Sequence, residues 1–226
     1  MHIQHLHDWN ISAAEAIALQ KRLAAEINFH MPIDLDAIRL VAGVDVSVKT
    51  DPVTGAAHSQ AAVVVLRYPD MHVIETARAQ MPTPFPYIPG LLSFREGPVL
   101  ETAFGKLQAE PDVFIFDGMG RAHPRRIGIA SHMGLWLQKP TIGCGKTLLS
   151  GHFREPPNDR GAFSDLVDRG EVIGAVLRTR ATVKPVFISV GHRADLATSV
   201  ELVMRCTSKY RLPDPIRAAH NAAGAF

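Results

Sequence analysis

Hydrophobic positions follow two spacings along this sequence, and each spacing predicts one kind of element. Short apolar runs rich in β-branched residues predict strands, and they lie at 40–48, 61–68, 72–80, 113–116, 141–144, 172–178 and 186–190. Apolar residues three or four positions apart predict helices, and they lie at about 13–27, 98–108, 127–137 and 195–207. The polar stretch 155–161 is expected to form a surface loop.

Capping and turn residues support several of these boundaries. Ser12 followed by Glu15 is the pattern of a capping box, which favours a helix that begins at the next residue. Pro98 fits the first turn of its helix, where the missing N–H costs little. Turn residues at 51–55 and 69–70 separate the first three strands. These strands are therefore predicted to form an antiparallel meander.

The order of elements predicts the fold class. A three-strand meander followed by helix, strand, helix, strand and helix is typical of an α/β fold with a ribonuclease H-like mixed β-sheet flanked by helices; other mixed α/β sheets are the alternatives. A chain of 226 residues is long enough for one well-packed domain and short for two. We expect a single domain over 1–226, with the ribonuclease H-like core at about 38–210.

Composition narrows the class of protein. The sequence is 46% hydrophobic and 20% charged, as in ordinary globular proteins. No apolar run reaches the roughly 18 residues needed to cross a bilayer, and residues 1–10 lack the basic start and apolar core of a secretory signal. Cys144 and Cys206 are expected to be small buried hydrophobes. We therefore expect a cytoplasmic protein with no membrane partner.

Charge is spread unevenly, although the net charge is only +2. Residues 1–113 carry 8 Lys or Arg and 13 Asp or Glu, whereas residues 114–226 carry 16 and 9. A basic half suits a polyanionic partner such as nucleic acid.

Three carboxylates stand out by their positions. Asp45 lies inside the first strand, where a charge is rarely tolerated without a partner. Asp117 ends the fourth strand, at the edge where open α/β sheets place their sites. Glu96 comes just before Pro98, after a proline-rich loop. Together they predict a Mg²⁺ site for phosphodiester cleavage, whereas a lone aspartate of this kind is as often a buried ion pair or a turn cap.

Two further residues are candidates beside such a metal. His220 can supply an imidazole, and its alternative is an exposed histidine near a chain end. Lys146 follows a short strand and can meet a phosphate or orient water, although most lysines simply solvate a surface.

The segment Pro84-Phe-Pro-Tyr-Ile-Pro-Gly90 is unusually rich in proline. Three prolines restrict φ and remove donors, which makes the loop stiff. A stiff loop with Tyr87 at its tip can insert into a base stack, and an enzyme that reads a damaged base must take that base out of the helix. The alternative is that Tyr87 packs on the core.

The loop after the fourth strand combines glycines with basic residues. Gly118 and Gly120 lack side chains, so a flat base can approach the backbone, whose N–H groups can read a keto oxygen. Arg125 and Arg126 can meet phosphates. The alternative is a tight turn followed by a solvated basic run.

Several longer strings resemble one known family. They are Gly-Val-Asp45-Val-Ser, Pro-Tyr87-Ile-Pro-Gly-Leu-Leu-Ser-Phe-Arg-Glu96, Asp117-Gly-x-Gly-x-x-His123-Pro-Arg, Ala-Ser-His132, Pro-Thr-Ile-Gly-x-x-Lys146, Gly-His192-Arg and Tyr210-Arg-Leu-Pro-x-Pro. Over about 41–220 the sequence resembles the endonuclease V family. The string from Pro86 to Glu96 is long enough to make chance a weak explanation.

The resemblance implies a function and a set of site residues. It implies a ribonuclease H-like, Mg²⁺-dependent endonuclease, with Mn²⁺ as a substitute, that cuts the second phosphodiester bond 3′ to deoxyinosine or another deaminated base in DNA repair. The implied metal ligands are Asp45, Glu96 and Asp117, with His220 nearby and Lys146 close to the scissile phosphate. The implied substrate contacts are the strand-separating wedge Pro86, Tyr87, Ile88 and Pro89, and the base-pocket residues Leu92, Gly118 and Gly120, joined by His123 and Arg125.

Other functions remain as alternatives. Vertebrate relatives prefer inosine-containing RNA, so an inosine-specific endoribonuclease is one alternative. The others are a non-catalytic reader of deaminated bases, a different ribonuclease H-like nuclease, such as a junction resolvase or a hybrid-cleaving ribonuclease, and a plain α/β binding protein. No obligate protein partner is indicated, so a monomer is expected.

The sequence departs from the family at Met119, where a polar residue is usual, and at Cys144-Gly145, where Val-Ala is usual.

Overall fold

The computed structural model describes residues 1–225 and contains nine strands and five α-helices among them. The strands are β1 (Leu40–Thr50), β2 (Ala57–Arg67), β3 (His72–Pro82), β4 (Val113–Phe116), β5 (Thr141–Gly145), β6 (His152–Phe153), β7 (Phe163–Asp168), β8 (Glu171–Leu177) and β9 (Val186–His192). The helices are α1 (Ala13–Leu23), which runs into the short 3₁₀ turn η1 (Ala24–Glu26), α2 (Leu92–Phe104), α3 (Ile129–Leu137), α4 (Leu196–Arg205) and α5 (Asp214–Gly224).

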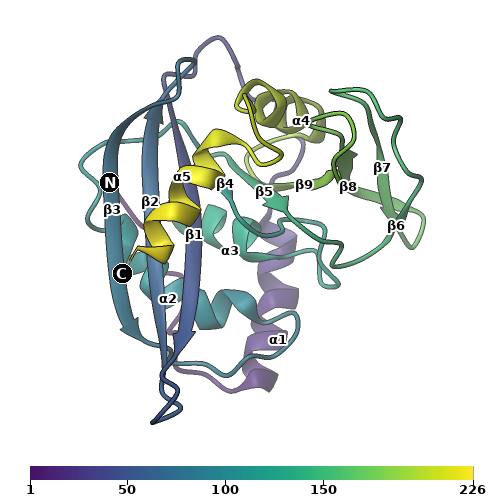
Figure 1. Cartoon of the computed structure of the whole chain (residues 1–226). Helices are drawn as coiled ribbons and strands as arrows, with labels where there is room; N and C mark the ends of the chain where they lie inside the picture. The colour runs from purple at the N-terminus through teal and green to yellow at the C-terminus, as the bar shows by residue number, and fades with distance from the viewer. Residues whose placement is uncertain (226) are drawn as a thin grey trace.

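All nine strands form one sheet in the order β3-β2-β1-β4-β5-β9-β8-β7-β6 (Figure 1). β1, β4 and β5 are parallel neighbours, and the other pairs are antiparallel. The predicted meander of the first three strands is therefore confirmed. The three parallel strands at the centre bring their carboxyl ends to one edge of the sheet.

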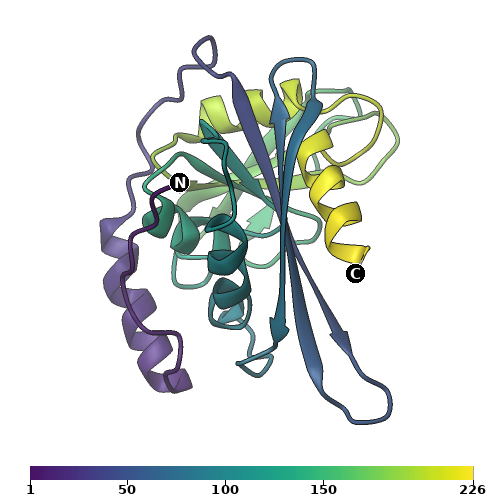
Figure 2. The ribbon, with the colours of Figure 1, turned by 90° about the vertical axis from the view of Figure 1, so that its left-hand side faces the viewer.

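Helices cover both faces of the sheet (Figure 2). On one face, α2 and α3 bury a core that includes Phe104, Phe116 and Trp136. On the other face, α4 and α5 bury a core that includes Val203 and Ile216. Strand residues alternate between these two cores, as the twofold period of a strand requires. The predicted mixed α/β sheet flanked by helices is confirmed.

Two local predictions hold at the start of the chain and at the cysteines. Ser12 and Glu15 form the expected reciprocal capping box at the start of α1. Cys144 and Cys206 are both free and buried, as expected of small hydrophobes. Among residues 1–225, no helix has the length and apolar character to cross a membrane.

The helix predicted to begin at Pro98 in fact begins at Leu92. Pro98 lies inside α2, where its missing N–H leaves the carbonyl of Phe94 without the usual helical partner. Phe94 is completely buried against the core, as is Leu91 just before the helix, so tertiary packing outweighs the proline. Glu96, which was expected just before the helix, therefore lies on the helix itself.

Three elements were not predicted: β6, β7 and α5. β6 has two residues and β7 alternates exposed and buried positions without a continuous apolar run, so neither gives a clear pattern. α5 begins with prolines, which signal its start, and its apolar residues Ile216, Ala219, Ala222 and Ala223 have helical spacing. Because α5 carries His220 and lies on β1 and β2, it extends the fold beyond the core predicted to end near 210.

Candidate active site

Two aspartates meet at the carboxyl ends of the central parallel strands. β1 and β4 pair in parallel with Val44 opposite Phe116, so Asp45 and Asp117 are the next residues on neighbouring strands. The Asp117 amide donates to the Val44 carbonyl at 2.9 Å, which extends the ladder by one step. Sheet register alone therefore places the two carboxylates together, as expected for a site at a strand end.

α5 brings a histidine to the same place. The Nδ1 atom of His220 lies 2.7 Å from an Asp45 carboxylate oxygen. α5 approaches β1 so closely that a Cβ on Gly43 would lie 1.9 Å from the Pro215 carbonyl oxygen. One ligand atom each from Asp45, Asp117 and His220 lies within 4.8 Å of the other two.

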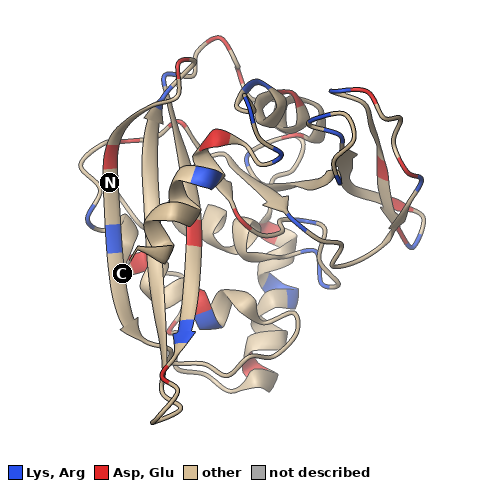
Figure 3. Ribbon diagram, in the orientation of Figure 1, with Lys and Arg blue, Asp and Glu red and all other residues tan. Residues whose placement is uncertain are grey.

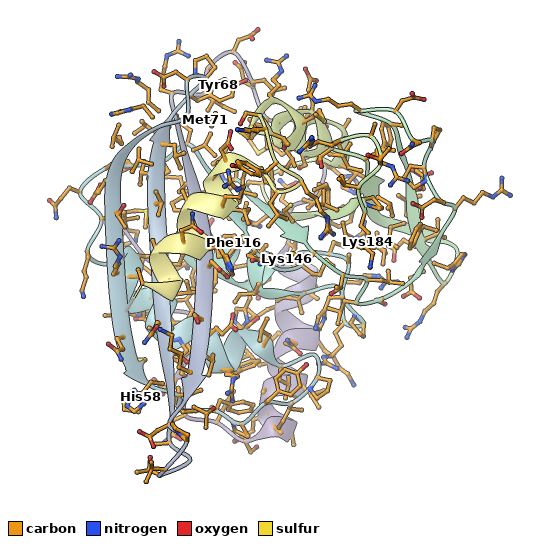
Figure 4. All side chains as sticks on the ribbon, in the orientation of Figure 1. His58, Tyr68, Met71, Phe116, Lys146 and Lys184 are labelled. Carbon is orange, nitrogen blue, oxygen red and sulfur yellow. The ribbon has the colours of Figure 1, made fainter. Side chains whose placement is uncertain are left out.

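Lys146 completes the group from β5. It follows that strand directly, and its ammonium pairs with the Asp117 carboxylate. The Arg211 guanidinium donates to the Lys146 carbonyl oxygen at 2.7 Å and so fixes the backbone there. Figure 4 labels Lys146 on the segment that follows β5.

Glu96 faces this cluster from α2. Burial raises the pKa of the Glu96 carboxyl to about 8, and the negative charges of Asp45 and Asp117 add to that rise. Burial also raises the pKa of Asp45, and Asp117 adds to it, while His220 and Lys146 oppose the shift. Glu96 and Asp45, whose ionisation is disfavoured by burial and by nearby negative charge, lie with Asp117 and an imidazole in a group that fits a hard divalent cation, which takes oxygen ligands.

The wedge Pro86–Pro89 precedes α2, the helix that carries Glu96. The side chain of Tyr87 is 71% exposed, so it does not pack on the core. Arg95 of α2 donates to the Phe85 carbonyl at 2.8 Å and holds the start of the loop. The loop therefore presents an aromatic tip on a supported base.

Three side chains converge on the other end of the wedge, at the Gly90 carbonyl oxygen. Gln20 donates to it at 3.0 Å, Arg125 at 2.6 Å, and the Nε2 atom of His123 lies 3.1 Å away. Gln20 also accepts from Arg125 at 2.6 Å. Burial, with Arg125 nearby, lowers the pKa of His123 to about 4. Because His123 is neutral near pH 7 and accepts from the Arg125 amide at Nδ1, its Nε2 carries the proton and donates.

Gly90 has φ of +81°, which favours glycine, and a Cβ there would lie 2.6 Å from the Arg125 guanidinium. Arg125 was expected to meet a phosphate of the substrate. Its guanidinium instead faces the wedge and not open solvent. We call Gln20, His123, Arg125 and the Gly90 carbonyl the wedge support.

A small cavity of about 120 Å³ lies against the wedge, which lines it with Tyr87, Ile88 and Pro89. Leu92 and His123 line it as expected, together with Met119 and Leu149. Gly118 and Gly120 are not among its lining residues within 1–225.

The Gly120 amide donates to Ser189 Oγ at 2.9 Å, and a Cβ on Gly120 would lie 2.1 Å from the Val190 carbonyl oxygen. The glycine at 120 therefore allows the backbone to approach β9 closely. Its N–H already donates to Ser189, so it is not available to a base. A Cβ on Gly118 would lie 2.7 Å from the side chain of Ile129.

The basic run after β4 is also partly used within the protein. Arg126 pairs with Asp168 at 2.8 Å and with Glu171 at 2.7 Å, so it is tied to the turn between β7 and β8 and is not free for phosphate. Arg121 pairs with Glu171 as well. Lys and Arg residues are nevertheless frequent around α4 and its neighbouring loops (Figure 3).

Sequence reasoning missed three residues of this site. Gln20 is buried on α1, Arg211 follows α4, and Leu149 follows Lys146. A polar residue at an inward position of α1 was the one signal for Gln20, since buried polar groups need partners. Nothing in the local sequence marks Arg211 or Leu149 as part of the site, because only the fold brings them to it.

The fold and the cluster define a class of protein. A mixed sheet whose central strand ends carry two aspartates and a lysine, with a histidine from a covering helix beside them and a third carboxyl facing them, is the arrangement of a ribonuclease H-like nuclease.

Comparison with known proteins identifies the family. Residues 20–221 match the family described as Endonuclease V. An endonuclease V from Methanothrix thermoacetophila is 48% identical over 220 residues, covering 97% of this chain and 94% of the relative. One from Trichormus variabilis is 47% identical over 227 residues, covering 99% of each.

Solved structures of endonuclease V proteins are also similar to this chain. Endonuclease V from Bacillus subtilis has a TM-score of 0.95 and 35% identity, covering 99% of this chain and 96% of the other. Ciona intestinalis endonuclease V, in complex with a 24mer DNA containing an inosine followed by a ribo-adenosine, has a TM-score of 0.79 and 29% identity, covering 93% and 95%. The chain belongs to the endonuclease V family of nucleases, and its fold is ribonuclease H-like.

Proposed function

We propose that this chain is a Mg²⁺-dependent endonuclease that nicks DNA at the second phosphodiester bond 3′ to deoxyinosine or another deaminated base, in DNA repair. The observation that carries the proposal is the cluster of Asp45, Asp117 and His220, whose ligand atoms lie within 4.8 Å of one another. The Ciona relative bound to inosine-containing DNA supports the substrate class.

Asp45 and Asp117 are the residues that would hold the metal, with Glu96 facing them and Mn²⁺ as a substitute for Mg²⁺. When bound, the ion supplies an activated water and charge stabilisation for the leaving oxygen. Lys146, held beside Asp117, offers its ammonium to the scissile phosphate. His220 is held by Asp45 and can pass a proton at its ring nitrogens.

The wedge and the small cavity select the base. Tyr87, exposed between Pro86 and Pro89, enters the base stack and fills the gap that the displaced base leaves. The displaced base enters the cavity lined by Leu92 and His123. Gly118 and Gly120 lie behind the cavity in this proposal, and Arg125 acts on the substrate by holding the wedge.

A second candidate function is an inosine-specific endoribonuclease. The observation that favours it is the ribo-adenosine after the inosine in the DNA bound to the Ciona relative. We further propose that the chain works as a monomer, since one chain contributes every residue of the site, and in the cytoplasm, since both cysteines are unpaired.

The test is cleavage of an end-labelled DNA duplex that contains one deoxyinosine, with Mg²⁺ and with a chelator. An unmodified duplex and an inosine-containing single-stranded RNA are run beside it. A Mg²⁺-dependent nick one nucleotide beyond the lesion, absent from the unmodified duplex, is expected. Faster cleavage of the RNA would favour the second function, and no cleavage of either inosine substrate by folded protein would contradict both.

A further inference from the structure

A second and larger cavity, of about 610 Å³, also opens beside the catalytic cluster. Lys146 lines it, so the cavity shares the ammonium that pairs with Asp117. Leu148 lines this large cavity and Leu149 lines the small one, so the short segment after Lys146 separates the two. Protein pockets for small organic ligands are roughly 300–1,000 Å³. The large cavity therefore has the size for a nucleotide.

The walls of the large cavity are held in place by arginines. Arg211 donates to the carbonyl oxygens of Lys184 and Pro185, both at 2.8 Å, in addition to that of Lys146. Arg178 pairs with Glu155 at 2.6 Å and donates to backbone carbonyls in the loop after Glu155. These guanidinium groups are occupied, so they shape the cavity and do not offer charge to a ligand.

The charge available to a ligand is positive. The ammonium of Lys184 is exposed at the rim and has no partner among residues 1–225. The ammonium of Lys146 also lines the cavity and pairs with Asp117 at the catalytic cluster, where the proposed function places the scissile phosphate. The acidic residue of the lining, Glu155, is already paired with Arg178. Figure 4 labels the two lysines on segments that reach the cavity from β5 and from the loop before β9. Two lysines on one cavity suit two phosphates of a nucleic-acid strand.

The rest of the lining suits a base. Phe153 and Phe187 lie edge to face with their ring centroids 5.5 Å apart, and Leu148 is 44% exposed above the cavity. Aromatic and apolar surfaces hold unstacked bases without regard to their sequence. The cavity therefore combines an apolar floor with cations at its edge.

We infer that the large cavity binds the nucleotide on the 3′ side of the cut, the second nucleotide 3′ to the lesion; this inference rests on the proposed function. The 5′-phosphate of that nucleotide is the scissile group beside Lys146. Its base lies against Leu148 and Phe153, and its 3′-phosphate meets Lys184. The lesion lies in the small cavity on the other side of the segment after Lys146, so the strand crosses the catalytic cluster between two pockets.

The test uses two deoxyinosine duplexes, one intact and one with an abasic site at the second nucleotide 3′ to the lesion. The wild-type kcat/KM is expected to be about tenfold lower on the abasic duplex, because the base contact is lost. In Leu148→Ala this difference is expected to shrink to less than threefold. Lys184→Ala is expected to raise KM about fivefold, while Arg169→Gln, an exposed cation outside the cavity, leaves KM unchanged.

Equal cleavage of the intact and abasic duplexes by the wild-type protein would overturn the inference and leave the proposed function standing. A tenfold difference that persists in Leu148→Ala would also overturn it, since the effect would then belong to the duplex and not to the cavity. The wild-type comparison needs no variant, so it stands even if Leu148→Ala folds poorly. No cleavage of any inosine substrate would overturn the function and the inference together.

Discussion

The Gly90 carbonyl oxygen accepts hydrogen bonds from Gln20, Arg125 and His123, which belong to two separate parts of the chain. Gln20 is 1% exposed and makes hydrogen bonds with both ends of its amide. Removing that amide leaves buried partners unsatisfied at a cost of about 1–3 kcal/mol. The position of the wedge therefore depends on a residue in α1 that touches no substrate.

Gln20→Leu is expected to raise KM for a deoxyinosine duplex about tenfold, because the wedge loses its fixed position. Its Mg²⁺ dependence is expected to stay unchanged, because the metal cluster is untouched. Steady-state cleavage over a range of duplex concentrations measures both. Gln108→Leu, at an exposed position, is the matched control. Equal KM in the wild type and Gln20→Leu would show that the wedge support has no role.

The two departures from the family pattern are neighbours in space. A Cβ on Gly145 would lie 2.3 Å from Met119 Cε and 2.9 Å from its Sδ. Met119 therefore fills the space that a side chain at 145 would need. Met119 also lines the small cavity. The larger side chain at 119 and the missing side chain at 145 therefore both affect the edge of the proposed base pocket.

Gly145→Ala is expected to push the flexible end of Met119 into the small cavity. The free energy of unfolding should change by less than about 1 kcal/mol, because an unbranched side chain adapts easily, while KM for deoxyinosine DNA rises severalfold. Adding Met119→Ala should restore KM toward the wild-type value. Urea unfolding and cleavage kinetics on the single and double variants measure this coupling. Additive effects on KM would contradict it.

The residues that could be predicted from the sequence are those whose chemistry conflicts with their local pattern. Asp45 interrupts an apolar strand and Asp117 ends one, so each is conspicuous within its own segment of sequence. Gln20 gave only the signal of a polar residue at an inward helix position, and Arg211 gave none. Their roles come from partners about 70 and 65 residues away, Gly90 and Lys146, which no local pattern reveals.

At the scale of elements, α5 is the part that local sequence reasoning left out, although it carries His220. Its 11 residues make too short a helix to be stable alone in water, so packing on β1 and β2 stabilises it. α2 shows the same effect, because buried Phe94 and Leu91 keep it helical through Pro98. The bounds of β4 were predicted correctly, because a short continuous apolar run by itself indicates a buried strand.

Gly43→Ala tests the placement of α5. The added Cβ would meet the Pro215 backbone, which cannot rotate away, so α5 must shift. We expect a loss of about 1–3 kcal/mol in the free energy of unfolding, and a fall in kcat because His220 moves away from Asp45. Urea unfolding and single-turnover cleavage measure the two effects. Gly224→Ala, at the open end of α5, is the control and should be neutral. A neutral Gly43→Ala would contradict the close approach.

At the scale of the whole molecule, one continuous sheet runs from β3 to β6. We propose on this basis that residues 1–226 form a single domain. The cluster lies near the middle of the sheet, between a meander from the acidic half of the sequence and strands from the basic half. The acidic cluster therefore lies where the sheet passes into the half of the sequence that carries an excess of Lys and Arg, which suits a polyanionic partner.

Buried histidines make the stability of the fold depend on pH. Burial, with His7 and His123 nearby, lowers the pKa of His132 to about 3, whereas the unfolded value is about 6.5. Between these two values the unfolded chain binds a proton that the folded chain does not. The folded state therefore loses stability as the pH falls below about 6.5, and this loss reaches about 2 kcal/mol at pH 5.

Urea unfolding of the wild type at pH 7 and pH 5 is expected to show lower stability at pH 5. His132→Phe should show a smaller difference between the two pH values, because the group that resists protonation is gone. His72→Phe, which changes an exposed histidine, should keep the wild-type difference. An equal difference in His132→Phe and the wild type would show that His132 does not carry the effect.

The central claim is that Asp45 and its neighbours hold the ion that drives cleavage. It is tested most directly by the single-turnover cleavage rate of a deoxyinosine duplex at increasing Mg²⁺, for the wild type, Asp45→Asn and Asp165→Asn, which changes an exposed strand carboxylate outside the cluster. We expect saturation with Mg²⁺ in the wild type and Asp165→Asn, and a loss of about a hundredfold or more in Asp45→Asn with duplex affinity retained. A rate in Asp45→Asn within tenfold of the wild type would contradict the account.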